Sequence, residues 1–290
     1  MSEIKLKDPQ TGEISYEDPP AKGILIWLYK DSIISKLARA LLAYIPFLSW
    51  GYALIQKSSF SRSKIRPFIK KYNVNEVEFL GETGTFKSFA DFFERRLKPE
   101  ARPIDSKPTA MVSPVDGRLV KIDLDKNFDV KERQLTLEEL VKDPAIANRF
   151  KGGTALRIRL APQDYHRVHA PFDGTVKEIR LINGPLYSVS PIALKDHICI
   201  LQENKRVLID FDDFAMVLVG ATFVGTIHLE PNLQPKATVK KGEEIAHFSF
   251  GGSMCVLLLK SNFSFDSKLD FPKGEVLMKM GQPIAHLRSS

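Results

Sequence analysis

Short apolar runs separated by Gly, Pro and Asn fill this chain from about residue 110 to its end. In 154-TALRIRLA-161, leucine and isoleucine alternate with arginine, which is the side-chain period of a β-strand whose two faces meet different surroundings. Further runs are VKEIRLI, RVLIDF, AMVLVGA, TFVGTIHL and MCVLLLK. Many short strands with turn signals between them predict a mostly antiparallel β-sandwich or barrel-like domain over residues 106–290.

Residues 1–105 have a different character. A polar leader over residues 1–22, which we expect to be mobile, precedes the most apolar part of the chain at residues 23–56. In 88-SFADFFERRL-97, a capping serine and a stripe of Phe and Leu at helical spacing predict a helix. The predicted fold class is therefore α+β, with a helical N-terminal third followed by the β-rich domain.

The apolar segment 23-GILIWLYKDSIISKLARALLAYIPFLSWGYALIQ-56 is expected to lie on a membrane rather than cross it. Its longest uncharged run, residues 40–56, contains a proline and falls short of the roughly 20 residues that a spanning helix needs. Directly after it, 57-KSSFSRSKIRPFIKK-71 holds six basic residues and no acidic one, which favours an anionic membrane surface. A helical layer packed on the rest of the protein is the alternative that the sequence leaves open.

Charge and cysteine content limit the kinds of partner and the cellular compartment that are expected. The net charge of +7 suits an anionic partner without selecting one. The basic cluster lacks the interleaved aromatic residues of a base-stacking surface, so we predict no nucleic-acid partner. Cys199 and Cys255 lie in strand-like runs without ligand spacing, which indicates reduced thiols in a reducing compartment. The histidines of 164-DYHRVHAPFDG-174 have no carboxylate or thiol at ligand spacing, so no metal site is predicted.

Two glycines and a serine interrupt the apolar run 245-IAHFSFGGSMCVLLLK-260. A nucleophile elbow is excluded, because Met254 and Cys255 follow Ser253 where that motif needs a second glycine. A glycine bulge in a strand is one interpretation. The other is self-cleavage, because glycine on the carbonyl side leaves room for the serine hydroxyl to attack its own preceding peptide bond. Acyl shift, elimination and hydrolysis would then leave a pyruvoyl group at a new N-terminus.

Two further stretches carry chemical side chains, 113-SPVDGRLV-120 and 164-DYHRVHAPFDG-174. Taken singly, an Asp-Gly pair most often caps its own turn, and a histidine is most often structural. Taken together with the serine, they supply the Asp, His and Ser of a nucleophilic triad, whose members need only meet in space.

These stretches together resemble the phosphatidylserine decarboxylase family, whose members are self-processing, pyruvoyl-dependent enzymes. The resemblance covers about residues 86–285, and DYHRVH with a downstream GGS is its most specific pairing. The matching stretches are 88-SFADFFERRLKPEARPID-105, 113-SPVDGRLV-120, 164-DYHRVHAPFDG-174, 183-NGPLYSVSPIAL-194, 219-VGATFVGTI-227 and 241-KGEEIAHFSFGGS-253.

The resemblance implies a processing triad of Asp116, His169 and Ser253. In it His169 takes the Ser253 proton and Asp116 orients His169, so that the Gly252–Ser253 peptide splits. Ser253 then becomes the pyruvoyl cofactor. The products would be a β chain of residues 1–252 and an α chain of residues 253–290.

The resemblance also implies that phosphatidylserine is decarboxylated to phosphatidylethanolamine through a Schiff base, with His166 as the acid that reprotonates the substrate. Phosphatidylserine and an anionic membrane surface are the expected partners, with peripheral attachment to the cytoplasmic side of the cell membrane. Whether the protein forms a homodimer is left open.

Two rival interpretations follow from particular residues. The family motif usually continues Gly-Ser-Thr or Gly-Ser-Ser, whereas Met254 follows here, so an uncleaved, lipid-binding scaffold is the alternative function. The stretches 170-APFDGTV-176, 239-VKKGEEIAHF-248 and 277-LMKMG-281 resemble turns of biotinyl or lipoyl carrier domains. Residues 280–290 are too few to build the second half of such a domain after Lys279, so a carrier function is disfavoured.

Overall fold

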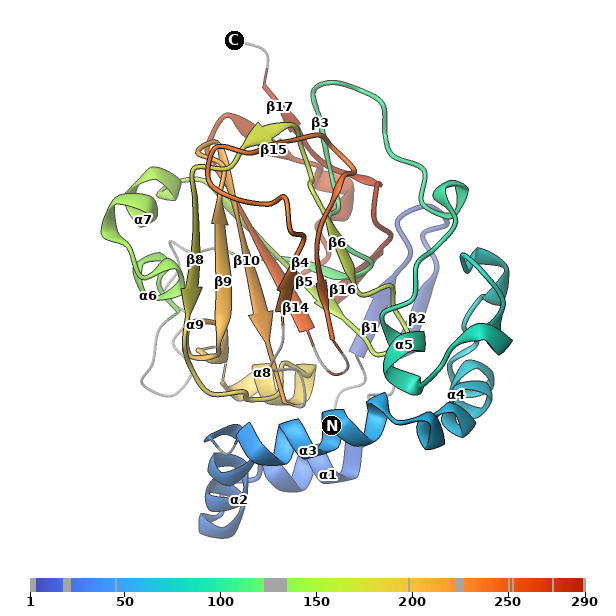
Figure 1. Cartoon of the computed structure of the whole chain (residues 1–290). Coiled ribbons are helices and arrows are strands. Elements are labelled where there is room, and N and C mark those ends of the chain that lie inside the picture. The colour runs from blue at the N-terminus through green and yellow to red at the C-terminus, as the bar shows by residue number, and fades with distance from the viewer. Residues whose placement is uncertain are drawn as a thin grey trace.

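The structure is a computed structural model, which describes residues 4–17, 22–44, 46–122, 135–197, 199–222, 227–249, 251, 253–272 and 274–288. Within them, a nine-stranded sheet has the order β2-β1-β16-β4-β5-β14-β10-β9-β8 (Figure 1). Its pairings are antiparallel except that of β1 with β16. The strands are β1 (Ile4–Lys7), β2 (Ile14–Glu17), β4 (Gly117–Ile122), β5 (Thr154–Leu160), β8 (Glu178–Ile182), β9 (Arg206–Asp210), β10 (Phe214–Gly220), β14 (Ser253–Leu259) and β16 (Glu275–Met278).

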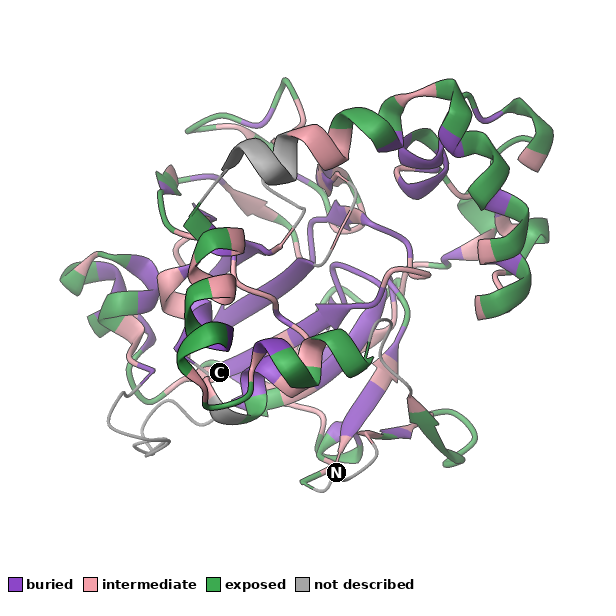
Figure 2. Ribbon diagram, turned by 90° about the horizontal axis from the view of Figure 1, so that it is seen from below, coloured by how far each residue is buried: buried purple, intermediate pink, exposed green. Residues whose placement is uncertain are grey.

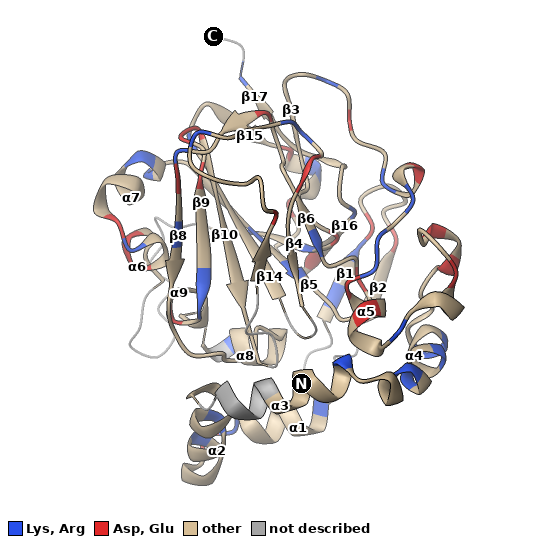
Figure 3. Cartoon of the chain, viewed as in Figure 1, with Lys and Arg blue, Asp and Glu red and all other residues tan. Residues whose placement is uncertain are grey.

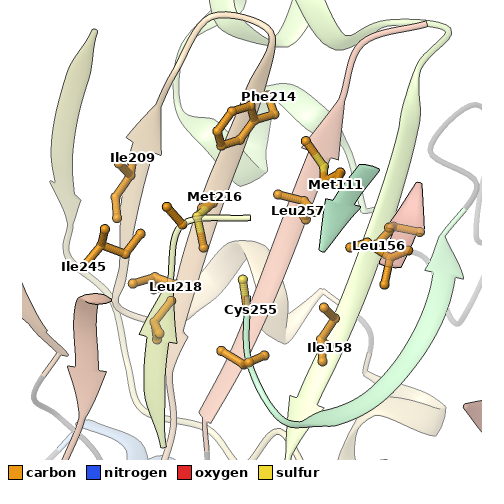
Figure 4. Close-up of a cluster of buried hydrophobic side chains, with 14 of the residues drawn as sticks. Met111, Leu156, Ile158, Ile209, Phe214, Met216, Leu218, Ile245, Cys255 and Leu257 are labelled. Atoms are coloured by element: carbon orange, nitrogen blue, oxygen red, sulfur yellow. The ribbon is translucent and has the colours of Figure 1, made fainter. Parts of the chain in front are cut away.

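Three small sheets complete the described strands, and the main core lies between them and one face of the large sheet. Leu156 of β5, Leu218 of β10 and Leu257 of β14 pack there with Ile245 of β13 and Met111 of β3 (Figure 4). The predicted alternation in β5 is confirmed. The small sheets are β11 (Ile227–Leu229), β13 (Glu244–Phe248) and β6 (Arg167–His169); β12 (Thr238–Val239) and β7 (Gly174–Thr175); and β15 (Phe263–Phe265), β17 (Pro283–Leu287) and β3 (Ala110–Val112).

Helices cover the other face of the large sheet, where Leu208, Val217 and Val256 pack against Leu140 and Leu201. Strands β10 and β14 are buried on both faces, so each face needs an apolar cover. The α+β class is confirmed, although these helices of the β-rich region were not predicted. They are α6 (Leu137–Val141), α7 (Pro144–Phe150), α8 (Pro191–Asp196) and α9 (Ile200–Glu203).

The N-terminal third is helical, as predicted. Three of its helices form a layer beneath one end of the large sheet (Figure 1): α1 (Lys22–Leu28), α2 (Ile33–Tyr44) and α3 (Pro46–Lys57). The described helices include none long and apolar enough to cross a bilayer. The others are α4 (Ile65–Tyr72) and α5 (Phe89–Phe93), with 3₁₀ turns at Ser59–Lys64, Glu76–Glu78, Thr83–Thr85 and Pro99–Ala101 and, near the C-terminus, at Ser267–Leu269. Helix α5 is the predicted one, and the Ser88 side chain caps it by accepting from the Asp91 amide. It is shorter than predicted, because it ends at Phe93 and Leu97 forms an isolated β-bridge with Phe79.

The expectation of a mobile leader is wrong for residues 4–17, which form the β1–β2 hairpin at the edge of the large sheet. The Glu17 carboxylate accepts from Arg118 Nε at 3.0 Å and from Arg159 Nη2 at 2.8 Å. Both arginines are buried, and a buried cation needs a partner. The hairpin supplies that partner and is thereby fixed to β4 and β5.

Candidate active site

Ser253 is the first residue of β14 and pairs with Leu160 of β5 on one side and Gly220 of β10 on the other. Its side chain is fully buried, and its Oγ lies 3.1 Å from Nδ1 of His166. Gly252, on the other side of the predicted scissile bond, lies outside the described residues. The predicted nucleophile therefore lies at the end of a central strand, in hydrogen-bond contact with one of the two candidate histidines.

The hydrogen bonds of His166 fix its tautomer. Nε2 lies 3.1 Å from the Ala161 carbonyl oxygen, which can only accept, so Nε2 carries the proton. In a neutral ring, Nδ1 then accepts from the Ser253 hydroxyl. Complete burial lowers the pKa of His166 to about 3, so the ring is neutral at pH 7. The ring of Phe93, from α5, stacks on it with a centroid distance of 3.9 Å.

The low pKa of His166 predicts acid sensitivity. The unfolded chain binds a proton at this residue below about pH 6.5, and the folded chain does not until about pH 3. The contribution to stability is thus complete above pH 6.5 and falls as the pH drops. Between pH 7 and pH 5 the free energy of unfolding should lose about 2 kcal/mol through this one group.

This loss can be measured by urea unfolding of the single-chain Ser253→Ala variant at the two pH values. Adding His166→Gln should reduce the pH-dependent loss by that amount, whatever it does to the absolute stability. An unchanged difference between pH 7 and pH 5 would contradict the prediction.

His169, the last residue of β6, has other partners. Its Nδ1–H donates to the Gly242 carbonyl at 2.9 Å, and Nε2 accepts from the Tyr165 hydroxyl at 3.2 Å. Burial lowers the pKa of His169, while the hydrogen bond to Gly242 and the charges of Glu244 and Asp116 act against burial and favour the imidazolium. The nitrogen of His169 that can take a proton is therefore Nε2.

Asp116 precedes β4 in the predicted Asp-Gly turn. A Cβ at Gly117 would lie 2.6 Å from the Arg159 carbonyl oxygen, so only glycine lets β4 approach β5 here. The Asp116 carboxylate accepts from Arg102 Nε at 2.8 Å and Nη2 at 2.6 Å, and from the Met280 amide at 2.8 Å. Its negative charge also acts on His169, where it favours the protonated imidazole.

The structure thus joins the predicted site residues differently from the predicted triad. Within the described residues, the hydrogen bonds link Ser253 with His166 and tie Asp116 and His169 to other partners. Sequence reasoning did not single out three neighbours of the site, although all lie in the stretches that matched the family. They are Phe93, Arg102 and Tyr165.

A cavity of about 500 Å³ lies beside Asp116. Arg102 and Tyr165 also line it, whereas Ser253 and His166 do not. The cavity therefore gives access to the carboxylate end of the site and not to the serine.

One group of side chains in the described part of the chain contains enough potential ligands for a metal ion. Ligand atoms of Glu230, Glu244 and His247 lie within 4.8 Å of one another. The Glu244 carboxylate is already paired with Arg167. His166 and His169 each have separate partners and do not converge on a common point for an ion.

A buried serine at the start of a central strand, with a neutral histidine on its hydroxyl, is a candidate nucleophilic site. Comparisons with known proteins identify the family. The family described as phosphatidylserine decarboxylase matches residues 89–286. The chain belongs to this family.

Similar proteins named phosphatidylserine decarboxylase proenzyme occur in several bacteria. One from Clostridium perfringens strain SM101 is 39% identical, over 94% of this chain and 91% of that protein. One from Fusobacterium nucleatum is 38% identical over 90% and 89%, and one from Chlamydia pneumoniae 38% over 84% and 83%. Among solved structures, Helicobacter pylori Csd3 matches at 14% identity, over 60% of this chain and 40% of that chain, with a TM-score of 0.24 that supports no argument.

Proposed function

We propose that this chain is a proenzyme that cleaves itself between Gly252 and Ser253 and then decarboxylates phosphatidylserine to phosphatidylethanolamine. The observation that carries the proposal is the buried Ser253 hydroxyl in contact with His166, in a chain of this family. The test is to incubate the purified protein with phosphatidylserine vesicles and measure released CO₂ and the ethanolamine lipid. Processed protein without either product would overturn the substrate assignment.

Processing needs a base for the Ser253 hydroxyl, and we assign this role to His169. His166 contacts the hydroxyl, but a ring with a pKa of about 3 is a poor proton acceptor. The charges of Asp116 and Glu244 favour the protonated form of His169. In this structure the Ser253 hydroxyl contacts His166, so proton transfer requires His169 to come within hydrogen-bond distance of Ser253.

The bond changes in processing balance within the chain and one water molecule. Ser253 Oγ attacks the Gly252 carbonyl, the peptide C–N bond breaks, and an ester forms. Elimination removes the Cα proton of residue 253, breaks the Cβ–Oγ bond and releases the Gly252 carboxylate, which leaves a Cα–Cβ double bond. Water then hydrolyses the dehydroalanine at position 253 with loss of ammonia, which leaves the pyruvoyl group.

The residues present fit a pyruvoyl group at position 253, because Ser253 is fully buried and its side chain contacts a neutral imidazole. When formed, the group supplies a ketone for the substrate amine and a carbonyl that takes up the electrons released with CO₂. His166 Nδ1 lies beside this position and carries no proton in the neutral ring. We propose that Nδ1 takes up a proton released by the substrate ammonium group and then delivers it to the substrate carbon. Burial at this point excludes bulk water from the reacting atoms.

Met254 does not weigh against processing. Its side chain packs in the helix-side core, whereas Cys255, its neighbour in β14, packs in the core on the other face. Successive residues of a strand point to opposite faces, so Ser253 shares the face of Cys255. A side chain at position 254 therefore points away from the Ser253 hydroxyl, and the enzyme is favoured over an uncleaved scaffold.

We further propose that the layer of α1–α3 docks on an anionic membrane. Seen from below, these helices present many exposed residues to the viewer (Figure 2). In α2, Ile33, Leu37 and Leu41 are exposed at helical spacing, an apolar stripe that no described part of the chain covers. Lys and Arg residues lie on α4, at the opposite end of this part of the molecule from α2 (Figure 3). An apolar stripe together with a basic segment suits an anionic bilayer surface.

The proposed membrane layer lies next to the serine end of β14. Gly220, which pairs with Ser253, has its carbonyl bonded by Asn204 at 2.8 Å. Asn204 also holds Tyr187, whose ring meets that of Tyr44 in α2 edge to face at 6.0 Å. A lipid head group at this surface would thus approach the site from the correct end of the sheet.

Replacing Leu37 and Leu41 with serine should weaken binding to vesicles that contain phosphatidylserine. Each buried leucine contributes roughly 1.5 kcal/mol or more, so the pair should cost about 100-fold in partition coefficient. Sedimentation with vesicles measures this. The control is Leu181→Ser, which removes an equally exposed leucine on β8. Equal binding by both variants would place the membrane contact elsewhere.

A further inference from the structure

We propose that Arg102 is a positioning residue for processing, which sets the Asp116 carboxylate in its working orientation. This inference rests on the proposed role of Asp116. The guanidinium meets the carboxylate with two prongs, Nε to Oδ1 at 2.8 Å and Nη2 to Oδ2 at 2.6 Å. Both side chains are buried, at 7% and 9% exposure. A two-pronged pair of this kind fixes the plane of the carboxylate as well as its position.

The third nitrogen of Arg102 anchors the guanidinium itself. Nη1 donates to Glu78 Oε2 at 2.8 Å and to the Ala101 carbonyl at 2.6 Å. On the other side of the carboxylate, the Met280 amide donates to Oδ1 at 2.8 Å. Asp116 is therefore held between Arg102, from the predicted β chain, and Met280, from the predicted α chain.

The orientation of Asp116 matters because it acts on His169 as a charge and not through a described hydrogen bond. Such an interaction depends on the distance between the two groups. Lysine at position 102 would keep the positive charge but would lose the planar fork. Replacing arginine with lysine therefore separates the positioning of Asp116 from the neutralisation of its charge.

The experiment follows the rate of self-cleavage of freshly translated full-length chains. Arg102→Lys should slow cleavage by about 100-fold, the cost typical of a misplaced catalytic group. Arg102→Ala should be slow in buffer and recover when free guanidinium is added, whereas methylammonium should not restore it. The cavity of about 500 Å³ that both residues line gives the ion a route to Asp116. Cleavage of Arg102→Lys at the wild-type rate, or an Arg102→Ala chain that guanidinium does not rescue, would overturn the inference.

Two further variants separate this inference from its premise. Arg149→Lys alters another arginine that binds two carboxylates, those of Asp210 and Asp212, and should cleave at the wild-type rate. Asp116→Asn tests the premise. If it cleaves normally, the role proposed for Asp116 fails. If it is slow while Arg102→Lys is normal, only the positioning role of Arg102 fails.

Discussion

The Ser253→Ala chain is expected to remain a single polypeptide, whereas the wild-type chain separates into residues 1–252 and 253–290. Alanine removes the only atom that attacks the Gly252 carbonyl, so cleavage should be abolished rather than slowed. Intact mass under denaturing conditions measures the result directly. In the wild type, the smaller species should be lighter than a serine-initiated peptide by one ammonia, because a pyruvoyl group has replaced the amino terminus.

The matched control is Ser249→Ala, four residues earlier in the same segment. Its hydroxyl contacts Nε2 of His228 at 2.9 Å, so this variant also breaks a serine–histidine contact. It should be cleaved normally. A cleaved Ser253→Ala chain would rule out the mechanism, and an uncleaved wild type would restore the lipid-binding scaffold as the leading interpretation.

Replacing the two histidines of DYHRVH should separate the two reactions. His169→Ala should stay uncleaved, because it lacks the base. His166→Ala should be cleaved, carry the pyruvoyl group and decarboxylate about 10²- to 10⁴-fold more slowly, the usual cost of losing a general acid. Mass measurement reports cleavage, and CO₂ release from phosphatidylserine vesicles reports turnover.

The reverse pattern has a clear structural meaning. If His166→Ala stays uncleaved while His169→Ala is processed, the 3.1 Å contact between His166 and Ser253 marks the base, and the roles must be exchanged. His286→Ala, at a partly exposed position in β17, controls for the loss of a histidine elsewhere and should behave as wild type in both assays.

The strands could be predicted because their periodicity is local. Helices α6 and α9 could not be predicted with the same ease, because the need for them arises from the burial of β10 and β14 on both faces, a property of the assembled sheet. The β1–β2 hairpin was missed for a similar reason. Its polar sequence indicates a mobile segment, and the pairing of Glu17 with the buried Arg118 and Arg159 arises only in the assembled sheet.

The site was predictable in its residue types but not in its contacts. His166 and His169 are three residues apart, and an odd spacing in extended chain sends two side chains to opposite sides. They therefore meet different partners, Ser253 and Tyr165. Likewise, the ion pair of Asp116 with Arg102 joins a turn to the residue that follows a 3₁₀ segment, and no pattern of spacing encodes such a contact.

The strand order has a consequence for the mature protein. Two strands of the C-terminal segment are inserted between strands of the longer polypeptide, β14 between β5 and β10 and β16 between β1 and β4, and a third, β17, pairs with β3. After cleavage at the proposed bond, two separate polypeptides would therefore form one cooperative folding unit. They would fold and unfold together as a single domain does. The short polypeptide could leave only if the sheet opened, and to return it would have to insert two strands and pair a third with β3. The lifetime of the association between the two polypeptides should thus be set by the rate at which the sheet opens, and not by an equilibrium between free and bound chains.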